Sequence, residues 1–336
     1  VPYGHLLEAT RATINIARPL RPAARLALAA MANEAIRGLV LGAARLLRLL
    51  RLTRPLARLP GRAGFAFAML EATRPVVAAG PAPPPSGGER GTVATLKGCV
   101  MEGLFAHTNR ATERTLARNG YRLVPAPGQH CCGALHAHAG ASAGATRLAR
   151  RNIDAFERSG ARYVAVNSAG CGAMMKEYGH LLQDDPGWSE RAARFSAGVR
   201  DVSELLAAAG PVPGGAVDAR TAYDAPCHLL HGQRVADPPL AVLRAIPGLT
   251  LSSLPDADRC CGGAGIYNLV EPAIAGAVLA PKLEQVRQSQ ATLVATGNPG
   301  CHMQIGAGLL RAGIGARCVH PVDLLDASYR ASAPPA

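Results

Sequence analysis

Eight of the nine cysteines fall into two copies of one spacing pattern, and this repeat limits the folds open to the chain more than any other feature. The two copies consist, in chain order, of Cys99, Cys131, Cys132 and Cys171, and of Cys227, Cys260, Cys261 and Cys301. Matching cysteines lie 128 to 130 residues apart, and VAVNSAGC at 164–171 parallels VATGNPGC at 294–301. Such self-similarity predicts two homologous domains, which we place at residues 92–212 and 213–336.

Each copy alternates short apolar runs with helical patterns. The runs expected to form strands are 92–96, 121–125 and 162–166 in the first copy, and 221–224, 249–252 and 292–295 in the second. The clearest helices are expected at 106–119 and 141–159, each followed by a glycine as a stop signal. Buried apolar strands joined by helices indicate an α/β fold, in which each domain is a small parallel sheet flanked by helices. The cysteines follow the carboxyl ends of these strands, where such sheets bind ligands.

A basic helical segment, residues 1–75, precedes the two domains. Residues 1–62 hold eleven arginines against Glu8 and Glu34, and four prolines are expected to divide the segment into short helices. Two interpretations fit this composition: a helical cap packed on the main body, or a surface that meets a partner subunit or anionic lipid. A proline- and glycine-rich linker is expected at 76–91.

Charge and hydropathy argue against several classes of function. Nucleic-acid binding would need aromatic side chains beside the basic residues, and Tyr3 is the single aromatic residue within 1–62. The apolar run at 26–41 is interrupted by Glu34 and Arg37 and is too short to span a membrane. Because no signal peptide is recognisable, we expect a cytoplasmic protein, with peripheral contact to the cytoplasmic face of the inner membrane as a second expectation.

The cysteines point to metal or redox chemistry, because nine cysteines without a secretion signal are not typical of a disulfide scaffold. Thiolates bind zinc, copper(I) and iron–sulfur clusters. Structural zinc sites favour C-x₂-C turns, whereas the adjacent sulfurs of Cys131 and Cys132 can reach different irons of one cluster. The pattern therefore favours a cluster. A zinc site, and thiols that act without metal, stay open as alternatives.

Other residues near the cysteines carry weaker signals. His130, His228 and His302 do not recur between the copies, so we expect hydrogen bonds or packing contacts from them rather than metal ligation. Cys318 has no counterpart either, since counting places it opposite Gly198, and we expect a buried free thiol. No nucleophile beside a base, carboxylate pair or phosphate-binding loop stands out, and no catalytic residue is predicted.

The sequences around the cysteines resemble the cysteine-rich CCG domain family. The segments that carry the resemblance are GCVMEGLF, HCCGALHAHAG, CCGGAGIYNL and GNPGCHMQ, together with VPYGHLLE at the start of the chain. This family includes the cysteine-rich subunits of heterodisulfide reductase and of anaerobic glycerol-3-phosphate dehydrogenase, the lactate-utilisation proteins and the glycolate oxidase iron–sulfur subunits. The chain is most similar to the last of these groups.

The resemblance implies an iron–sulfur electron-transfer subunit of a glycolate, or other 2-hydroxy acid, oxidase or dehydrogenase. Electrons would pass from a flavin subunit toward a quinone or another acceptor, and a further FAD-binding subunit is expected. FAD would belong to the partners, and this chain would not be catalytic alone. The implied ligands of an iron–sulfur cluster, with [4Fe–4S] as the expected type, are the eight repeated cysteines. The alternative function is a zinc-binding or thiol–disulfide module of a heterodisulfide-reductase-like complex.

The chain departs from the family pattern in two places. In glycolate oxidase iron–sulfur subunits, a ferredoxin-like module with two C-x₂-C-x₂-C-x₃-C-P runs precedes a segment like VPYGHLLE, and this sequence starts at that segment. We interpret this as a truncation or as loss of the module. The fullest CCG motif also ends in C-x-x-C, and Ser168 and Asn298 stand where the first of those cysteines would be. Four thiolates per domain, rather than five, are therefore expected.

Overall fold

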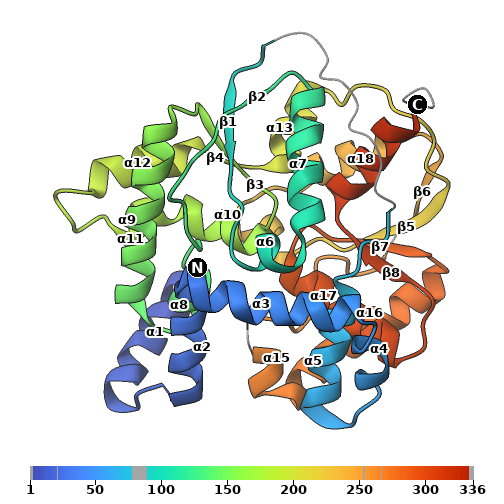
Figure 1. Ribbon diagram of the computed structural model, residues 1–336, viewed down its shortest axis with the longest axis horizontal. Helices are drawn as coiled ribbons and strands as arrows, with labels where there is room; N and C mark the ends of the chain where they lie inside the picture. The colour runs from blue at the N-terminus through green and yellow to red at the C-terminus, as the bar shows by residue number, and fades with distance from the viewer. Residues whose placement is uncertain (1–2, 21, 78–88, 253, 266, 333–336) are drawn as a thin grey trace.

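The computed structural model covers the 336-residue chain and describes it except for residues 1–2, 21, 78–88, 253, 266 and 333–336 (Figure 1). Its centre is a pair of four-stranded parallel sheets. The first contains β1 (Thr92–Thr95), β2 (Arg122–Leu123), β3 (Tyr163–Val166) and β4 (Val199–Asp201), in the order β2-β1-β3-β4. The second contains β5 (Ala219–Tyr223), β6 (Leu249–Ser252), β7 (Leu293–Ala295) and β8 (Arg317–Val319), in the order β6-β5-β7-β8. The identical strand order confirms the predicted α/β fold with two homologous domains.

The fourth strand of each sheet, β4 and β8, was not predicted. Each has three residues and contains an arginine, so neither shows the apolar run by which the other strands were found. Strand pairing also corrects one alignment. Val164 pairs with Val199 and Val294 pairs with Cys318, so the structural counterpart of Cys318 is Val199, not Gly198. Cys318 is a buried free thiol, as expected.

Helices cover both faces of each sheet. In the first domain they are α6 (Val100–Leu104), α7 (Ala106–Arg118), α8 (Ala134–His138), α9 (Ser142–Ser159), α10 (Ala169–Lys176), α11 (Tyr178–Leu181), α12 (Ser189–Gly198) and α13 (Val202–Ala209). In the second they are the π-helix η1 (His228–Gly232), α14 (Asp237–Arg244), α15 (Tyr267–Val270), α16 (Pro272–Ser289), α17 (Pro299–Arg311) and α18 (Pro321–Ala331). The longest helix of the first domain, α9, buries Leu148, Ile153 and Phe156 on one face and ends at Gly160, whose φ is 64°. Its counterpart α16 has the same length, 130 residues later.

The two domains share one hydrophobic core and are joined by polar contacts between α7 and α18. The shared core includes Leu116 and Leu206 from the first domain and Leu243 and Leu325 from the second. The polar contacts are the paired bonds of Arg114 to Asp326 at 2.7 Å, the bond of Thr108 to Asp323 at 2.9 Å and the bond of Asn119 to Tyr329 at 2.9 Å. The sheets therefore belong to one body, with a fixed relation between their carboxyl ends.

Five helices make up the N-terminal segment: α1 (Tyr3–Ala17), α2 (Pro22–Ala32), α3 (Glu34–Leu49), α4 (Thr53–Leu56) and α5 (Gly61–Ala72). Of these helices, α5 packs on the main body as the predicted cap would. Helix α5 packs on α17, where Ala68 and Ala307 are fully buried. Val76 and Val77 also pack against the shared core, so the start of the predicted linker is not exposed. Residues 78–88 of that linker lie outside the described residues.

Within the described residues, no single helix combines the length and hydropathy needed to cross a bilayer. The segments Ala24–Ala32 and Glu34–Leu49 reach those values only as a pair, and they are bent by 102° at the break between them.

Candidate metal centres

The four repeated cysteines of the first domain meet at the carboxyl ends of its strands. Cys99 follows β1 and is the residue at which α6 begins, the pair Cys131-Cys132 follows β2, and Cys171 lies in the first turn of α10 after β3. The Sγ atoms of Cys99 and Cys131 are 3.4 Å apart, and thiol hydrogen bonds connect Cys131 to Cys132 and Cys132 to Cys171. All are buried except Cys171, which is half-buried.

The second domain repeats this arrangement. Cys227 follows β5 at the start of η1, the pair Cys260-Cys261 follows β6, and Cys301 lies in the first turn of α17 after β7. Thiol hydrogen bonds again run from Cys227 to Cys260, from Cys260 to Cys261 and from Cys261 to Cys301. The residues brought together are therefore those predicted from the spacing. Across the described chain, no group of three or more His, Cys, Asp or Glu side chains forms a site for a single ion.

One cysteine of each group is favoured as a thiolate. Hydrogen bonds from Cys132 and Cys99 lower the pKa of Cys131 well below its usual range. Hydrogen bonds from Cys227 and Cys261, helped by the backbone N–H of Gly262 at 3.3 Å from the sulfur, lower the pKa of Cys260 to about 2. In both domains the first cysteine of the pair thus carries the charge most readily, and its neighbours act as thiol donors.

Glycine follows each cysteine pair because a second backbone segment lies against it. Gly133 and Gly262 have φ values of 88° and 80°, which other residues rarely adopt. A Cβ at Gly262 would lie 2.5 Å from the carbonyl oxygen of Ala275 on α16, and one at Gly133 would lie 3.3 Å from Cα of Ala145 on α9. The turn therefore packs each cysteine pair directly onto the long helix of its domain.

The same position on the two long helices anchors the cysteine loops, although the residues differ. On α9, Asn152 accepts a bond from the backbone N–H of His130 at 2.7 Å and donates to the carbonyl oxygen of Cys131 at 3.0 Å. On α16, the equivalent Lys282 donates to Asp224 at 2.5 Å and to the carbonyl oxygen of Ala257 at 3.1 Å. Sequence reasoning missed both residues, since each lies in the middle of a helix far from any cysteine.

The Lys282–Asp224 pair is almost completely buried, with 3% and 2% of the two side chains exposed. Asp224 also accepts a bond from Thr296 at 2.8 Å, and its backbone N–H donates to Ala295 at 2.9 Å. These contacts connect the loop before Cys227, the loop before Cys260 and the segment before Cys301. Burial raises the pKa of Asp224, and the lysine opposes that rise.

The two groups of cysteines lie on either side of a contact between α10 and α17. The backbone N–H of Ala169 donates to the carbonyl oxygen of Gly297 at 3.0 Å, and that of Gly170 donates to Oδ1 of Asn298 at 3.2 Å. The amide nitrogen of Asn298 lies 3.3 Å from Sγ of Cys301. Asn298, predicted only as a missing cysteine, is therefore a direct connection between the two centres.

This contact is not reciprocal. The counterpart of Ala169 is Pro299, which has no N–H to donate to Asn167, the counterpart of Gly297. The carbonyl oxygen of Asn167 is instead 3.0 Å from Nε2 of His320. Ser168, the counterpart of Asn298, precedes α10 without a side-chain capping bond among the described residues.

Of the three histidines singled out by the sequence, His302 and His228 make packing and hydrogen-bond contacts, whereas Nδ1 of His130 is buried without a hydrogen-bond partner among the described residues. His302 lies 3.1 Å from the carbonyl oxygen of Ala72 and packs edge-on against Phe105. His228 has Nδ1 at 3.6 Å from Sγ of Cys227, and its ring centroid is 5.4 Å from that of His138 in the other domain. His138 in turn lies 2.9 Å from Glu8 of α1. Sequence reasoning missed His138 and Glu8, because their approach depends on how the domains and α1 come together. The His138–His228 pair is therefore an interdomain ring contact next to Cys227.

The residues present fit an iron–sulfur cluster in each domain. All four donors are thiols, which are the ligands such clusters require. Two of the four in each domain lie at or in the first turn of a helix, where backbone N–H groups stabilise negative charge. Most of the sulfurs are buried, and N–H groups of Gly262 and Asn298 already point at two of them.

Comparison with known proteins agrees with this arrangement. The profile of the cysteine-rich domain family CCG matches residues 93–176 and 221–306. The chain is 39% identical over 241 residues to a probable glycolate oxidase iron-sulfur subunit of Bacillus subtilis, covering 69% of this chain and 54% of the relative. It is 34% identical over 220 residues to the glycolate oxidase iron-sulfur subunit of Escherichia coli, with 64% and 54% covered. It is 29% identical over 231 residues to lactate utilization protein A of Geobacillus kaustophilus, with 68% and 96% covered.

The chain spans about half the length of the two glycolate oxidase subunits that it matches. The two matched segments of the family profile contain all eight repeated cysteines and together make up just over half of the chain. The chain therefore belongs to the cysteine-rich CCG domain family.

Proposed function

We propose that the chain is an iron–sulfur electron-transfer subunit of a complex that oxidises glycolate or a related 2-hydroxy acid. The observation that carries the proposal is the pair of equivalent four-thiol centres joined through Asn298. The names of the relatives, which are iron-sulfur subunits of glycolate oxidase and a lactate utilization protein, support the same class of reaction.

In this proposal the eight repeated cysteines hold the clusters, with [4Fe–4S] as the expected type, and each cluster supplies one-electron transfer. The fold buries Cys99, Cys131, Cys132, Cys261 and Cys301, leaves Cys260 exposed, and holds the two centres on either side of the α10–α17 contact. A flavin subunit and a further FAD-binding subunit would provide the electrons, and a quinone or another acceptor would take them. We place the complex in the cytoplasm, in peripheral contact with the inner membrane.

Metal analysis tests the cofactor. Protein purified without oxygen is expected to contain about eight irons and eight acid-labile sulfides per chain, as two [4Fe–4S] clusters require. Iron, sulfide and zinc are measured on the same sample. One zinc per domain without labile sulfide would instead support the alternative, a zinc-binding or thiol–disulfide module of a heterodisulfide-reductase-like complex.

Asn298 should tune the second centre. Replacing Asn298 by alanine removes the N–H group that points at Cys301, and hydrogen bonds to cluster sulfurs favour the more negative, reduced state. A bond worth about 1 kcal/mol corresponds to about 40 mV for one electron, so the reduction potential of one of the two clusters should fall by roughly that amount. A redox titration followed by electron paramagnetic resonance measures the shift.

Ser168→Ala is the matched control, because Ser168 occupies the same position in the first domain. It should leave both potentials within about 10 mV of the parent, well below the expected shift. Equal potentials in the parent and in Asn298→Ala, at unchanged iron content, would contradict the role given to this amide.

A further inference from the structure

Helix α3 presents an apolar face to solvent. From Ala35 to Leu50, every exposed residue except Arg45 is apolar or glycine. The exposed side chains are large: Leu39 and Leu49 are each 76% exposed, and the others are Ile36, Val40, Leu46 and Leu50 at 46% to 57%. No residue of α3 is buried. A surface helix normally shows its polar face to water, so this helix is turned the other way.

The side of α3 that faces the protein explains its orientation. Arg48 donates to the carbonyl oxygens of Thr73 and Leu104 at 2.8 and 3.0 Å, which fixes the helix to the body through a charged side chain. Leu41 and Ala44 pack beside Met101 and Phe105. The exposed apolar stripe therefore cannot turn inward without breaking these contacts, and it is a stable feature of the surface.

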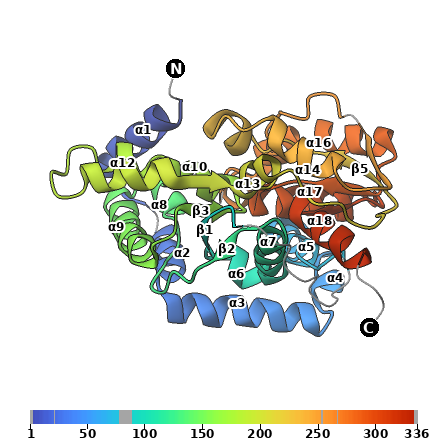
Figure 2. The same cartoon turned by 90° about the horizontal axis from the view of Figure 1, so that it is seen from above.

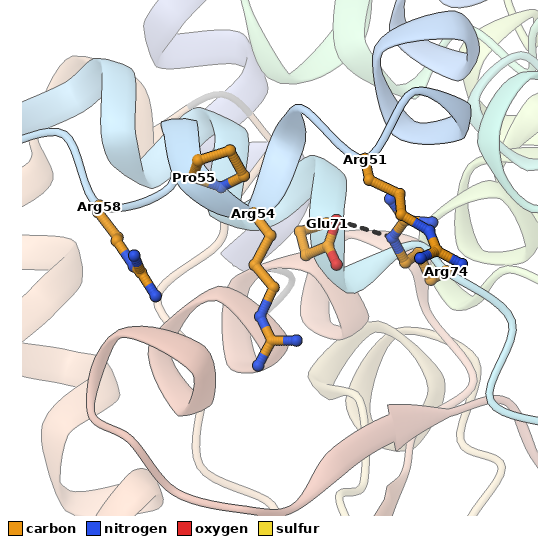
Figure 3. A pocket seen from close by; sticks show the side chains of 6 residues that line it. All are labelled: Arg51, Arg54, Pro55, Arg58, Glu71 and Arg74. Atoms are coloured by element: carbon orange, nitrogen blue, oxygen red, sulfur yellow. Dashed lines mark hydrogen bonds and ion pairs between the residues drawn. The ribbon is translucent and has the colours of Figure 1, made fainter.

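A cluster of arginines adjoins the carboxyl end of this stripe. Arg51, Arg54, Arg58 and Arg74 line a hollow of about 390 Å³ together with Pro55 and Glu71 (Figure 3). Glu71 is bonded to Arg74 at 2.8 Å, whereas Arg51, Arg54 and Arg58 have no acidic partner among the described residues. Figure 3 shows the Glu71–Arg74 ion pair as a dashed line and no such interaction from Arg54 or Arg58 to the other residues drawn. The cluster therefore carries positive charge that no carboxylate within the described part of the chain neutralises.

A second hollow, of about 580 Å³, continues the same surface. It is lined by arginines and by two leucines of the stripe, namely Arg45, Leu46, Arg48, Leu49, Arg74, Pro75 and Arg317. Burial lowers the pKa of Arg48, and the nearby positive charges of Arg74 and Arg45 add smaller contributions in the same direction. Apolar side chains and guanidinium groups thus share one surface.

The position of α3 suits contact with a flat surface. Figure 2 shows α3 along the lower edge of the molecule, with the cysteine-bearing domains on one side of it. Its 16 residues give a ridge about 24 Å long. The stripe itself offers no side-chain hydrogen-bonding group, so its partner must be apolar where it meets the leucines and anionic where it meets the arginines.

We propose that α3 and the adjoining arginines, Arg51, Arg54 and Arg58, bind the surface of an anionic lipid bilayer. The leucines enter the boundary between head groups and acyl chains, and the guanidinium groups contact lipid phosphates. The proposal that α3 binds lipid rests only on the surface features described above. The use of this binding, to bring the clusters close to a membrane-bound acceptor, rests on the proposed function.

Vesicle co-sedimentation of the full iron-loaded chain tests the proposal. Binding to vesicles of 70% phosphatidylcholine and 30% phosphatidylglycerol should be at least about tenfold stronger than to phosphatidylcholine alone. Leu39→Gln/Leu46→Gln and Arg54→Gln/Arg58→Gln should each weaken it at least about tenfold. The matched control is Ile274→Gln/Val278→Gln on α16, whose side chains are 54% and 42% exposed, and it should bind like the parent.

Iron content and monomeric state are measured for every variant. Unchanged iron with lost lipid binding supports the assignment and separates it from the fate of the clusters. The proposal is overturned if the parent does not bind anionic vesicles, or if the α3 variants bind as well as the α16 control. It is also overturned if the parent forms a dimer that the leucine substitutions dissociate, because the stripe would then be covered by a second copy.

Discussion

Replacing Cys132 by serine is expected to lower iron and acid-labile sulfide to about half, because only the first domain should lose its cluster. Cys132 lies in the middle of the line of thiols, hydrogen-bonded to both Cys131 and Cys171, and it is 2% exposed. A serine hydroxyl is a much poorer ligand for iron than a thiolate. Chemical analysis measures the loss, and electron paramagnetic resonance of the reduced protein should show one signal fewer.

Two variants make this result decisive. Cys261→Ser is the equivalent change in the second domain and should remove the other half of the iron. Cys318→Ala removes the ninth cysteine, which lies in β8 and packs in the same apolar cluster as Cys261 and Cys301 without belonging to the repeated set, and it should leave iron unchanged. Full iron content in Cys132→Ser, or an equal loss in Cys318→Ala, would be incompatible with the ligands proposed here.

Replacing Lys282 by methionine is expected to lower the free energy of unfolding by about 3–5 kcal/mol, because it leaves a buried carboxylate without its partner. Asp224 is 1% exposed, and its network connects the three segments that carry the cysteines of the second domain. Denaturant titration of the metal-free protein measures the loss. The same variant should release iron from the second domain faster than from the first.

Two comparisons isolate the effect of burial. Lys176 pairs with Glu204 at 2.8 Å in the first domain, but these side chains are 21% and 25% exposed, so Lys176→Met should cost only about 1 kcal/mol. The double variant Lys282→Met/Asp224→Leu should regain much of the lost stability, since it removes both charges. Leu96 already occupies the position of Asp224 in the first domain, where its N–H bonds to Ala165. If Lys282→Met cost no more than Lys176→Met, the buried pair would not be holding the loops.

Most of the correct predictions about the fold came from the spacing of the repeated cysteines. Their offset identified the duplication, and the short runs that precede the cysteines identified three strands of each sheet, although β2 itself has only two residues, both exposed. The strand-to-cysteine order then placed the thiols at one edge. Strands β4 and β8 were not predicted, because a three-residue strand that contains an arginine shows no apolar run in the sequence.

The connections around the centres could not be predicted in the same way. Lys282 sits in a long helix where a lysine is expected to face water, and only the tertiary fold turns it toward Asp224. The contacts of Asn298 with Gly170 and of His138 with His228 join different domains. They depend on how the two domains dock, which no local pattern describes.

Proline at position 299 gives the duplicated structure a direction. In a symmetric homodimer both halves would have the same residue there, and an electron would find two sites of equal energy. Because the two halves belong to one chain, Ala169 can donate across the contact while Pro299 cannot, and the amide of Asn298 serves only one of the two sets of sulfurs. With a cluster in each centre, as proposed, the covalent fusion would permit a difference in reduction potential between the two sites, and an electron would then reside preferentially on one of them.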